Sequence, residues 1–180
     1  MSAIDIHIIS RTGRVHWLLD SWMKRNGLRA DLIVSAYSVA QGRNNSVQLF
    51  LDGDKRFLLQ LDDDLAPDDD TAPIMDINSD AAIAYCSYPP RKQVRFNPEM
   101  PMPGCLRMRR DILEAMEPPW FQPEYDSTGG AQIDSEERLV IAKAKAMGHE
   151  PVMVGHAGHL VEVIAKYKNG QAAFMWPHSK

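Results

Sequence analysis

Short apolar runs recur along the first half of the chain, and the first of them is rich in β-branched residues. They occupy residues 4–9, 31–35, 57–61 and 81–88, and each has the length of a buried strand. Residues 15–27 place apolar side chains at helical spacing, and Asn26-Gly27 closes that segment as a helix end. Residues 41–51 read as a loop that leads into a second helix, with its cap expected among Asn44, Asn45 and Ser46.

This close alternation of strands and helices predicts an α/β fold, with a mostly parallel central sheet flanked by helices. Ligands of such sheets bind beyond the carboxyl ends of the strands. Three polar segments occupy these ends: residues 10–14, 35–43 and 62–64. We therefore expect the functional site where these segments meet.

The second half of the chain is less regular. Residues 88–104 are rich in proline and methionine, which predicts a long loop or an irregular hairpin. Residues 105–121 predict a strand and then a short helix, stopped by a Pro-Pro pair. The stretch SEERLVIAKAKAMG predicts a helix capped by Ser135 and ended by Gly148. Residues 152–174 predict two short strands around a His-rich turn.

With 180 residues, the chain has the size of one domain, and we expect residues 1–180 to form a single compact domain. Its net charge of −4 provides no overall attraction to nucleic acid or to anionic membranes. Two cysteines, Cys86 and Cys105, do not make a disulfide framework, so a reducing, cytoplasmic location is expected. No apolar run approaches the roughly 20 residues that span a bilayer, and no signal peptide is apparent.

An apolar strand runs directly into three adjacent carboxylates at Asp62, Asp63 and Asp64. Such close like charges repel unless water, cations or hydrogen-bond donors relieve them. The cluster can be a solvated acidic turn or a metal site, and its place at the carboxyl end of a strand favours the metal site. The acidic run at residues 68–70 reads instead as a solvated loop and helix cap.

The order of these segments resembles the GT-A glycosyltransferases, especially the family-2-like group. Asp62-Asp63-Asp64 looks like their Asp-x-Asp (DXD) motif, and Gly42-Arg43-Asn44 resembles the Arg-Asn segment that precedes it. SEERLVIAKAKAMG resembles the helix that a Glu-Asp pair opens, with Glu136-Glu137 in place of that pair. GHAGHL contains His156 and His159 and resembles the segment near the end of the family's domain whose histidine completes the metal site. The match covers most of the chain, and the order of its short motifs makes it specific.

This resemblance implies a compact GT-A-like (Rossmann-like) domain, with a nucleotide-binding half at residues 1–88 and an acceptor-side half at residues 89–180. It implies a metal-dependent glycosyltransferase that transfers a sugar from a nucleotide-diphosphate sugar, with a UDP-sugar as the first choice of donor. The acceptor is left open among a glycan, a lipid-linked sugar, a protein and a modified nucleobase. The oligomeric state is open as well.

On the family pattern, Asp64 binds a divalent cation directly, and Asp62 binds it too or holds the ribose or a metal-bound water. His159 completes the site from the other half of the domain, with His156 as the alternative. Mn²⁺ or Mg²⁺ suits such ligands, and a histidine favours Mn²⁺. The cation would stabilise the charge that builds up on the departing diphosphate.

A sugar transfer that inverts configuration needs a carboxylate to deprotonate the acceptor hydroxyl. By motif position Glu137 is the first candidate, followed by Glu136 and Asp134. The other residues expected to contact the donor are Ser10, Arg11, Arg43, Asp62 and Asp63. Arg91, Lys92 and Arg95 are expected near the diphosphate or an acidic acceptor.

Two other functions fit parts of the sequence. A nucleotidyltransferase also joins an α/β sheet to acidic metal ligands, but it usually has a Gly-rich phosphate loop near the first strand, and SRTGR is poor in glycine. A non-catalytic module that binds nucleotide sugars or glycans would keep the fold without turnover. The short chain and the Glu136-Glu137 pair are consistent with such a module. Turnover of a nucleotide sugar distinguishes the enzyme from the module.

Overall fold

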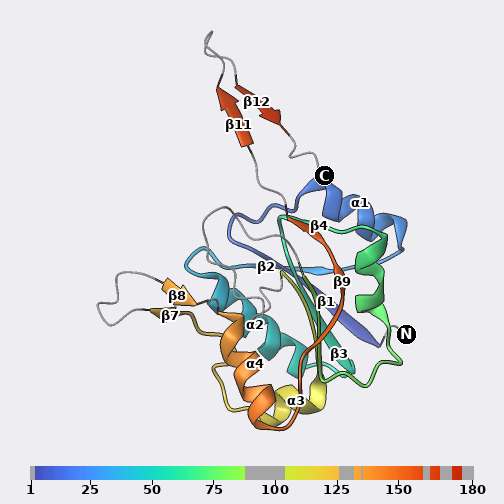
Figure 1. Ribbon diagram of the computed structural model, residues 1–180, viewed down its shortest axis with the longest axis vertical. Helices are drawn as coiled ribbons and strands as arrows, with labels where there is room; N and C mark the ends of the chain where they lie inside the picture. Colours follow the sequence, from blue (N-terminus) through green and yellow to red (C-terminus); the bar gives the residue numbers. More distant parts are fainter. Residues whose placement is uncertain are drawn as a thin grey trace.

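A computed structural model describes residues 3–87, 104–125, 132–134, 136–159, 163–166 and 172–175 (Figure 1). The strands are β1 (Ile4–Ser10), β2 (Asp31–Val34), β3 (Phe57–Asp62), β4 (Leu65–Ala66), β5 (Ile83–Ser87), β6 (Cys105–Arg109), β7 (Glu124–Tyr125), β8 (Gln132–Asp134), β9 (Val152–His156), β10 (Gly158–His159), β11 (Val163–Lys166) and β12 (Ala172–Met175). The helices are α1 (Trp17–Arg25), α2 (Val39–Leu51), α3 (Arg110–Ala115), α4 (Glu137–Ala146) and the 3₁₀ helix η1 (Asp69–Met75).

The central sheet of the described part of the chain has six strands in the order β2-β1-β3-β6-β5-β9. Strand β6 runs antiparallel to both of its neighbours, β3 and β5. The remaining pairs, β1 with β2, β1 with β3, and β5 with β9, are parallel. The prediction of an α/β fold with a mostly parallel sheet is therefore confirmed.

The two faces of the sheet bury separate apolar cores because side chains alternate along each strand. Helices α2, α3 and α4 cover one face, where Phe50 and Ile112 pack with Leu58 of β3. Helix α1 and η1 cover the other face, where Trp22 packs with Leu59 of β3. The sheet thus lies between two helical layers, and its strand ends remain available for a site.

Helix α2 begins earlier than the sequence predicts. Its N-cap is Ser38, whose side chain accepts a hydrogen bond from the backbone N–H of Gln41 at 3.0 Å. The expected caps therefore lie inside the helix, and Arg43 is a helical residue rather than part of a loop. This correction has a simple physical cause, because a serine hydroxyl satisfies the first orphan N–H groups of a helix as well as an asparagine does.

Gly42 allows α2 to lie close to the sheet. A Cβ atom at this position would lie 3.1 Å from Cβ of Ser35 and 3.2 Å from Cγ2 of Ile9. Tertiary packing thus explains a glycine that, read from sequence alone, indicates a loop. The close approach brings the first turns of α2 against the carboxyl ends of β1 and β2.

The predicted ends of helices α1 and α4 are confirmed. Gly27 follows α1 with a φ angle of 62°, and Gly148 follows α4 with a φ angle of 85°. Such positive angles suit glycine. Helix α4 begins at Glu137, and the expected cap Ser135 lies outside the described residues. Among the described residues, no helix is long and apolar enough to cross a membrane.

Candidate functional site

The carboxyl ends of β1 and β3 meet at one edge of the sheet, as predicted. Ile9 pairs with Asp62 in the parallel register of these strands. The Ser10 hydroxyl donates a hydrogen bond to a carboxylate oxygen of Asp63 at 2.5 Å and accepts one from the N–H of Gly13 at 3.0 Å. Ser10 and Asp63, both expected near the donor nucleotide, are thus in direct contact.

Backbone hydrogen bonds hold the acidic turn in place on both sides. The N–H of Asp62 donates to the carbonyl of Gly104 at 2.8 Å. The carbonyl of Asp63 accepts from the N–H of His16 at 2.9 Å, which ties the turn to the start of α1. Asp62, Asp63 and Asp64 are all half-buried. The backbone of the turn is therefore a fixed part of the sheet edge.

Arg43 lies completely buried beneath this turn, in contact with three carboxylates. Its Nη2 lies 2.7 Å from Oδ1 of Asp62 and 2.7 Å from Oε1 of Glu137. Its Nε lies 3.7 Å from Oε1 of Glu136. One guanidinium therefore joins the end of β3 to the start of α4.

Further contacts fix the position of the Arg43 guanidinium. Its Nη1 donates to Oε1 of Gln60 at 3.3 Å, and its Cζ lies 5.7 Å from the ring centroid of Phe121. Nε2 of Gln60 in turn donates to the Arg43 carbonyl at 3.0 Å and to Oγ of Ser46 at 2.9 Å. The charge of Arg43 is thus held at one place by polar and aromatic neighbours.

This position of Arg43 differs from the one that the sequence predicts. We expected Arg43 beside the nucleotide, whereas the structure places it below the carboxylates, with no exposed surface. The physical reason is electrostatic. Carboxylates that come together in a low-dielectric environment require a cation close by, and Nη2 of Arg43 contacts two of them.

Burial raises the pKa values of two carboxyl groups in this cluster. For Asp62, burial is the largest cause of the raised pKa. The neighbouring charges of Asp64 and Glu136 raise this pKa further, and the charge of Arg43 lowers it. Burial likewise raises the pKa of Glu137 to about 7, again against the opposing effect of Arg43. Three carboxyl groups thus share one guanidinium in a buried environment.

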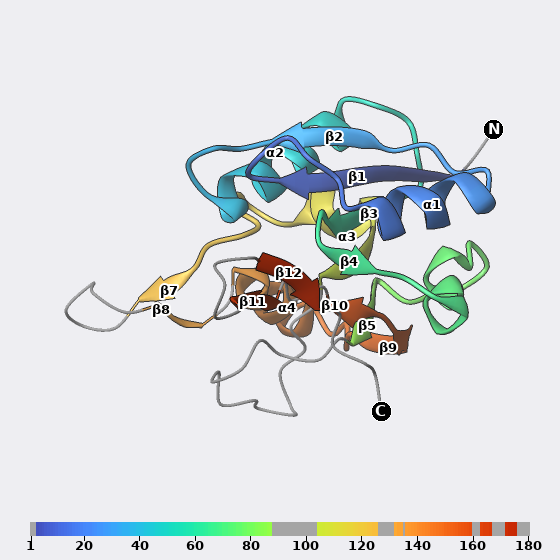
Figure 2. The same ribbon diagram turned by 90° about the horizontal axis from the view of Figure 1, so that it is seen from above.

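The strand pairing places one of the two candidate histidines beside the acidic turn. Strands β4 and β10 lie side by side (Figure 2), and in their antiparallel register His159 lies opposite Leu65, the residue that follows Asp64. The side chain of His159 lies outside the described part of the structure. His156 pairs with Ser87 instead, and its carbonyl accepts a hydrogen bond from Thr71. The register therefore favours His159 as the neighbour of the aspartates.

The other predicted residues are distributed as follows. Arg11 is exposed in the loop after β1. Asp134 belongs to β8, where its backbone pairs with Glu124, and its side chain is not among those described. The three basic residues expected near the diphosphate, Arg91, Lys92 and Arg95, lie outside the described residues.

Sequence reasoning missed Gln60 and Ser46, which support Arg43 from below. Gln60 offers a signal that could have been recognised, because it is the polar member of the otherwise apolar run FLLQL. A polar side chain in a buried strand must find hydrogen-bond partners. Ser46 offers no comparable signal, since a serine in a helix is usually exposed.

No protein-family model matches the chain, and a search of curated proteins finds no match. Several solved structures share its fold. The crystal structure of A197 from STIV has a TM-score of 0.64 at 17% identity, covering 98% of this chain and 96% of that chain. A candidate nucleotide-diphospho-sugar transferase from Desulfovibrio desulfuricans G20 has a TM-score of 0.52 at 9% identity, covering 89% and 83%.

A further similar structure is a glycosyltransferase involved in the glycosylation of the major capsid of PBCV-1. Its TM-score is 0.51 at 11% identity, and the match covers 87% of this chain and 92% of that chain. Likeness at such low identity demonstrates a shared fold. The chain thus has an α/β fold of the kind found in nucleotide-sugar transferases.

Proposed function

We propose that this protein is a metal-dependent glycosyltransferase, which transfers a sugar from a nucleotide-diphosphate sugar to an acceptor. One observation carries the proposal. Three aspartates follow one another at the carboxyl end of β3, at the same edge of the sheet as Ser10, and the β4–β10 register pairs His159 with Leu65, the residue after Asp64. The fold shared with structures named as sugar transferases supports it.

The carboxylates of the turn and an imidazole form a donor set that suits Mn²⁺ or Mg²⁺. In the proposed site Asp64 and His159 are the metal ligands. Arg43 holds Oδ1 of Asp62, so Oδ2 of Asp62 is the oxygen assigned to a metal-bound water or to the ribose. The cation supplies Lewis-acid stabilisation of the leaving diphosphate.

Glu137 is the proposed general base, which takes the proton of the acceptor hydroxyl as the sugar is transferred. A pKa of about 7 suits this role, because a base works best when its pKa lies near the operating pH. Arg43 holds one carboxylate oxygen of Glu137 and so fixes its orientation. Glu136, one residue before, is the alternative base and has more exposed surface than Glu137. Asp134 is the third candidate.

The donor nucleotide is proposed to lie over the loop that follows β1. Ser10 and Asp63 form one wall there, and Arg11 is exposed in the same loop. Arg43 acts in this arrangement as a positioning residue, since its guanidinium contacts Asp62 and Glu137 from below. A UDP-sugar is the first donor to test.

A thermal-shift screen tests the proposal with UDP-, GDP- and other nucleotide sugars, each with and without Mn²⁺. A ligand that binds only the folded protein raises its stability by about 2.7 kcal/mol at 100 times its Kd. We expect one donor to raise the melting temperature only when Mn²⁺ is present. The variant Asp64→Asn should lose that response. A screen in which no nucleotide sugar responds, or in which the response does not depend on Mn²⁺, contradicts the proposal.

A second outcome distinguishes the enzyme from a binding module of the same fold. Mn²⁺-dependent binding of a donor without any release of nucleoside diphosphate, even slow hydrolysis by water, would identify a non-catalytic module. Release of nucleoside diphosphate supports the transferase. Once donor binding has been established, the release of nucleoside diphosphate therefore distinguishes a transferase from a binding module.

A further inference from the structure

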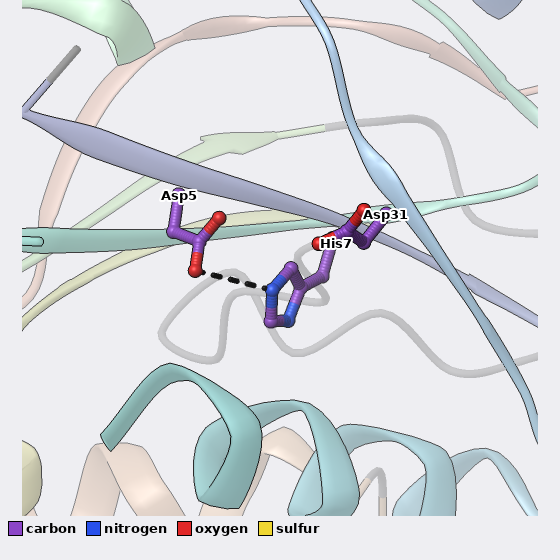
Figure 3. A group of neighbouring side chains, drawn as sticks. All are labelled: Asp5, His7 and Asp31. Atoms are coloured by element: carbon purple, nitrogen blue, oxygen red, sulfur yellow. Dashed lines mark ion pairs between the residues drawn. The ribbon is translucent and has the colours of Figure 1, made fainter. Parts of the chain in front are cut away.

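A second group of metal-ligating side chains lies at the opposite end of β1. Asp5, His7 and Asp31 each offer one ligand atom, and these atoms lie within 4.8 Å of one another (Figure 3). Asp5 and His7 are two residues apart on β1, so they project from the same face of the sheet. His7 pairs with Asp31 in the parallel register of β1 and β2. The backbone therefore fixes the relative positions of all three residues.

The imidazole of His7 is oriented as in a metal-bound histidine. It is 2% exposed, and its Nδ1 lies 2.7 Å from Oγ of Ser46. Its Nε2 faces Oδ2 of Asp5 at 3.4 Å, which is longer than an ordinary N–H···O hydrogen bond. A histidine that binds a metal through one ring nitrogen usually gives the other N–H to a hydrogen-bond partner.

Ser46 can serve as that partner because it is itself held in position. Nε2 of Gln60 donates to Oγ of Ser46 at 2.9 Å. A serine oxygen has two lone pairs, so it can accept from both Gln60 and Nδ1 of His7. In that arrangement Nε2 carries a lone pair that faces the carboxylate of Asp5, and it is available to a cation.

The charges of the group also call for a cation. Among the described residues, the ion pairs of Asp5 include no lysine or arginine, and Asp31 has no ion pair. Two carboxylates thus converge on one imidazole without a fixed positive charge. One divalent ion would neutralise both of them.

We propose that Asp5, His7 and Asp31 bind a divalent transition metal ion, with Zn²⁺ as the first choice. The ligands are Nε2 of His7 and one oxygen of each aspartate, with water in the fourth position. Two ligands of a tetrahedral zinc ion lie about 3.4 Å apart, given metal–ligand bonds of about 2.0–2.1 Å. The His7–Asp5 separation already has this value. Asp31 is exposed, and its carboxylate can turn toward the ion.

The proposed ion has a structural role that differs from the role of the cation at the acidic turn. Strand β2 is a four-residue edge strand, and of its side chains Ile33 is the buried one. A metal bound by Asp31 at the start of β2 and by two residues of β1 would fasten this edge strand to the sheet. Ser46 contacts His7, and Gln60 contacts both Ser46 and Arg43. The ion would therefore lie at the outer end of the hydrogen-bonded series of side chains that supports Arg43.

The proposal is tested on the full chain by measuring its zinc content. The protein is first equilibrated with excess Zn²⁺ and then dialysed exhaustively. We compare the wild type with Asp31→Asn, which changes an exposed side chain and should leave the fold intact. Asp54→Asn is the matched control, because Asp54 is an exposed aspartate distant from the group in sequence. Asp64→Asn keeps the new site but removes the proposed catalytic one, so failure of the two proposals can be distinguished.

We expect about one zinc ion per chain to be retained at this site by the wild type, by Asp54→Asn and by Asp64→Asn. Asp31→Asn should lose that ion. By calorimetric titration, Ser46→Ala should weaken zinc binding by about 10- to 100-fold, as the loss of a partner behind the ligand does. Equal zinc retention in Asp31→Asn and the wild type would overturn the proposal. So would the absence of retained zinc from all four proteins, and the group would then be a His–Asp ion pair only.

Discussion

Asp62 and Glu137 bind the same nitrogen atom: Nη2 of Arg43 lies 2.7 Å from a carboxylate oxygen of each. Asp62 closes β3, and Glu137 opens α4. In the proposed chemistry Asp62 holds a metal-bound water or the ribose, and Glu137 takes the proton of the acceptor hydroxyl. Their common partner fixes the distance between the two parts of the site.

Replacement of Arg43 by methionine should strongly destabilise the protein. The change leaves the carboxylates of Asp62 and Glu137 without their cation in a buried environment, and the expected loss is about 3–5 kcal/mol. Urea unfolding measures it. Arg25→Met, at the exposed end of α1, is the control and should cost less than about 0.5 kcal/mol.

A double variant separates the loss of charge from the loss of packing. Glu137→Gln removes one of the uncompensated charges, so Arg43→Met with Glu137→Gln should recover part of the lost stability. If the double variant is no more stable than Arg43→Met alone, buried charge is not the cause of the loss.

The elevated pKa of Glu137 predicts a pH-dependent stability. In the folded protein this pKa is about 7, compared with an ordinary value of 4.5. Between these pH values the folded state retains a proton that the unfolded state has released. The free energy of unfolding contributed by this group is therefore largest below pH 4.5, falls as the pH rises to about 7, and then levels off.

The variant Glu137→Gln supplies the comparison for this pH dependence. Between pH 5 and 7 the wild type should lose stability relative to the variant, since glutamine does not titrate. Chemical unfolding at several pH values measures the difference. A constant difference across the window would show that Glu137 titrates in its ordinary range.

Gly155 should tolerate no side chain, because β9 lies directly against η1. A Cβ atom at Gly155 would overlap the backbone carbonyl oxygen of Asp70. Since a backbone atom cannot rotate away, Gly155→Ala should cost about 1–3 kcal/mol. In Gly53→Ala the nearest atom, the carbonyl oxygen of Phe50, would lie at an ordinary 3.4 Å. Thermal unfolding of both variants checks this, and equal stability would contradict the close packing of β9 on η1.

The two cysteines should be unreactive until the protein unfolds. Both are buried, and the antiparallel register that pairs Tyr85 with Leu106 places Cys86 opposite Cys105. A hydrogen bond to Cys86 and burial raise the pKa of the Cys105 thiol, which disfavours the reactive thiolate. A disulfide reagent should react at least on the order of a thousandfold more slowly in buffer than in denaturant. Fast modification of the native protein would be inconsistent with these positions.

Several strands were predictable from sequence because they are short apolar runs that lie between polar turn segments. Residues 57–61 predict a strand, and β3 covers Phe57–Asp62. The position of β6 in the sheet was not predictable, since no local pattern shows that it lies antiparallel between β3 and β5. Strand order depends on pairings between segments that are distant in the sequence.

The site was predictable in its location but not in its internal contacts. The acidic turn stands out because it follows an apolar strand. The burial of Arg43 could not be foreseen, since a charged residue is buried only when it has partners, and Asp62 and Glu137 are remote from it in sequence. The start of α2 was missed because Gly42 indicates a loop, and its role in packing appears only in three dimensions.

Hydrolysis of a nucleotide sugar in the presence of Mn²⁺ tests the proposed function most directly, with Asp64→Asn compared against Asp69→Asn. Asp69 is an exposed aspartate in η1, so its replacement controls for the loss of one negative charge. We expect the wild type and Asp69→Asn to release nucleoside diphosphate at similar rates in a Mn²⁺-dependent reaction. Asp64→Asn should remain folded and lose at least about 100-fold in rate, because the metal stabilises the leaving group. Unchanged turnover by a folded Asp64→Asn protein would contradict the metal site at the end of β3.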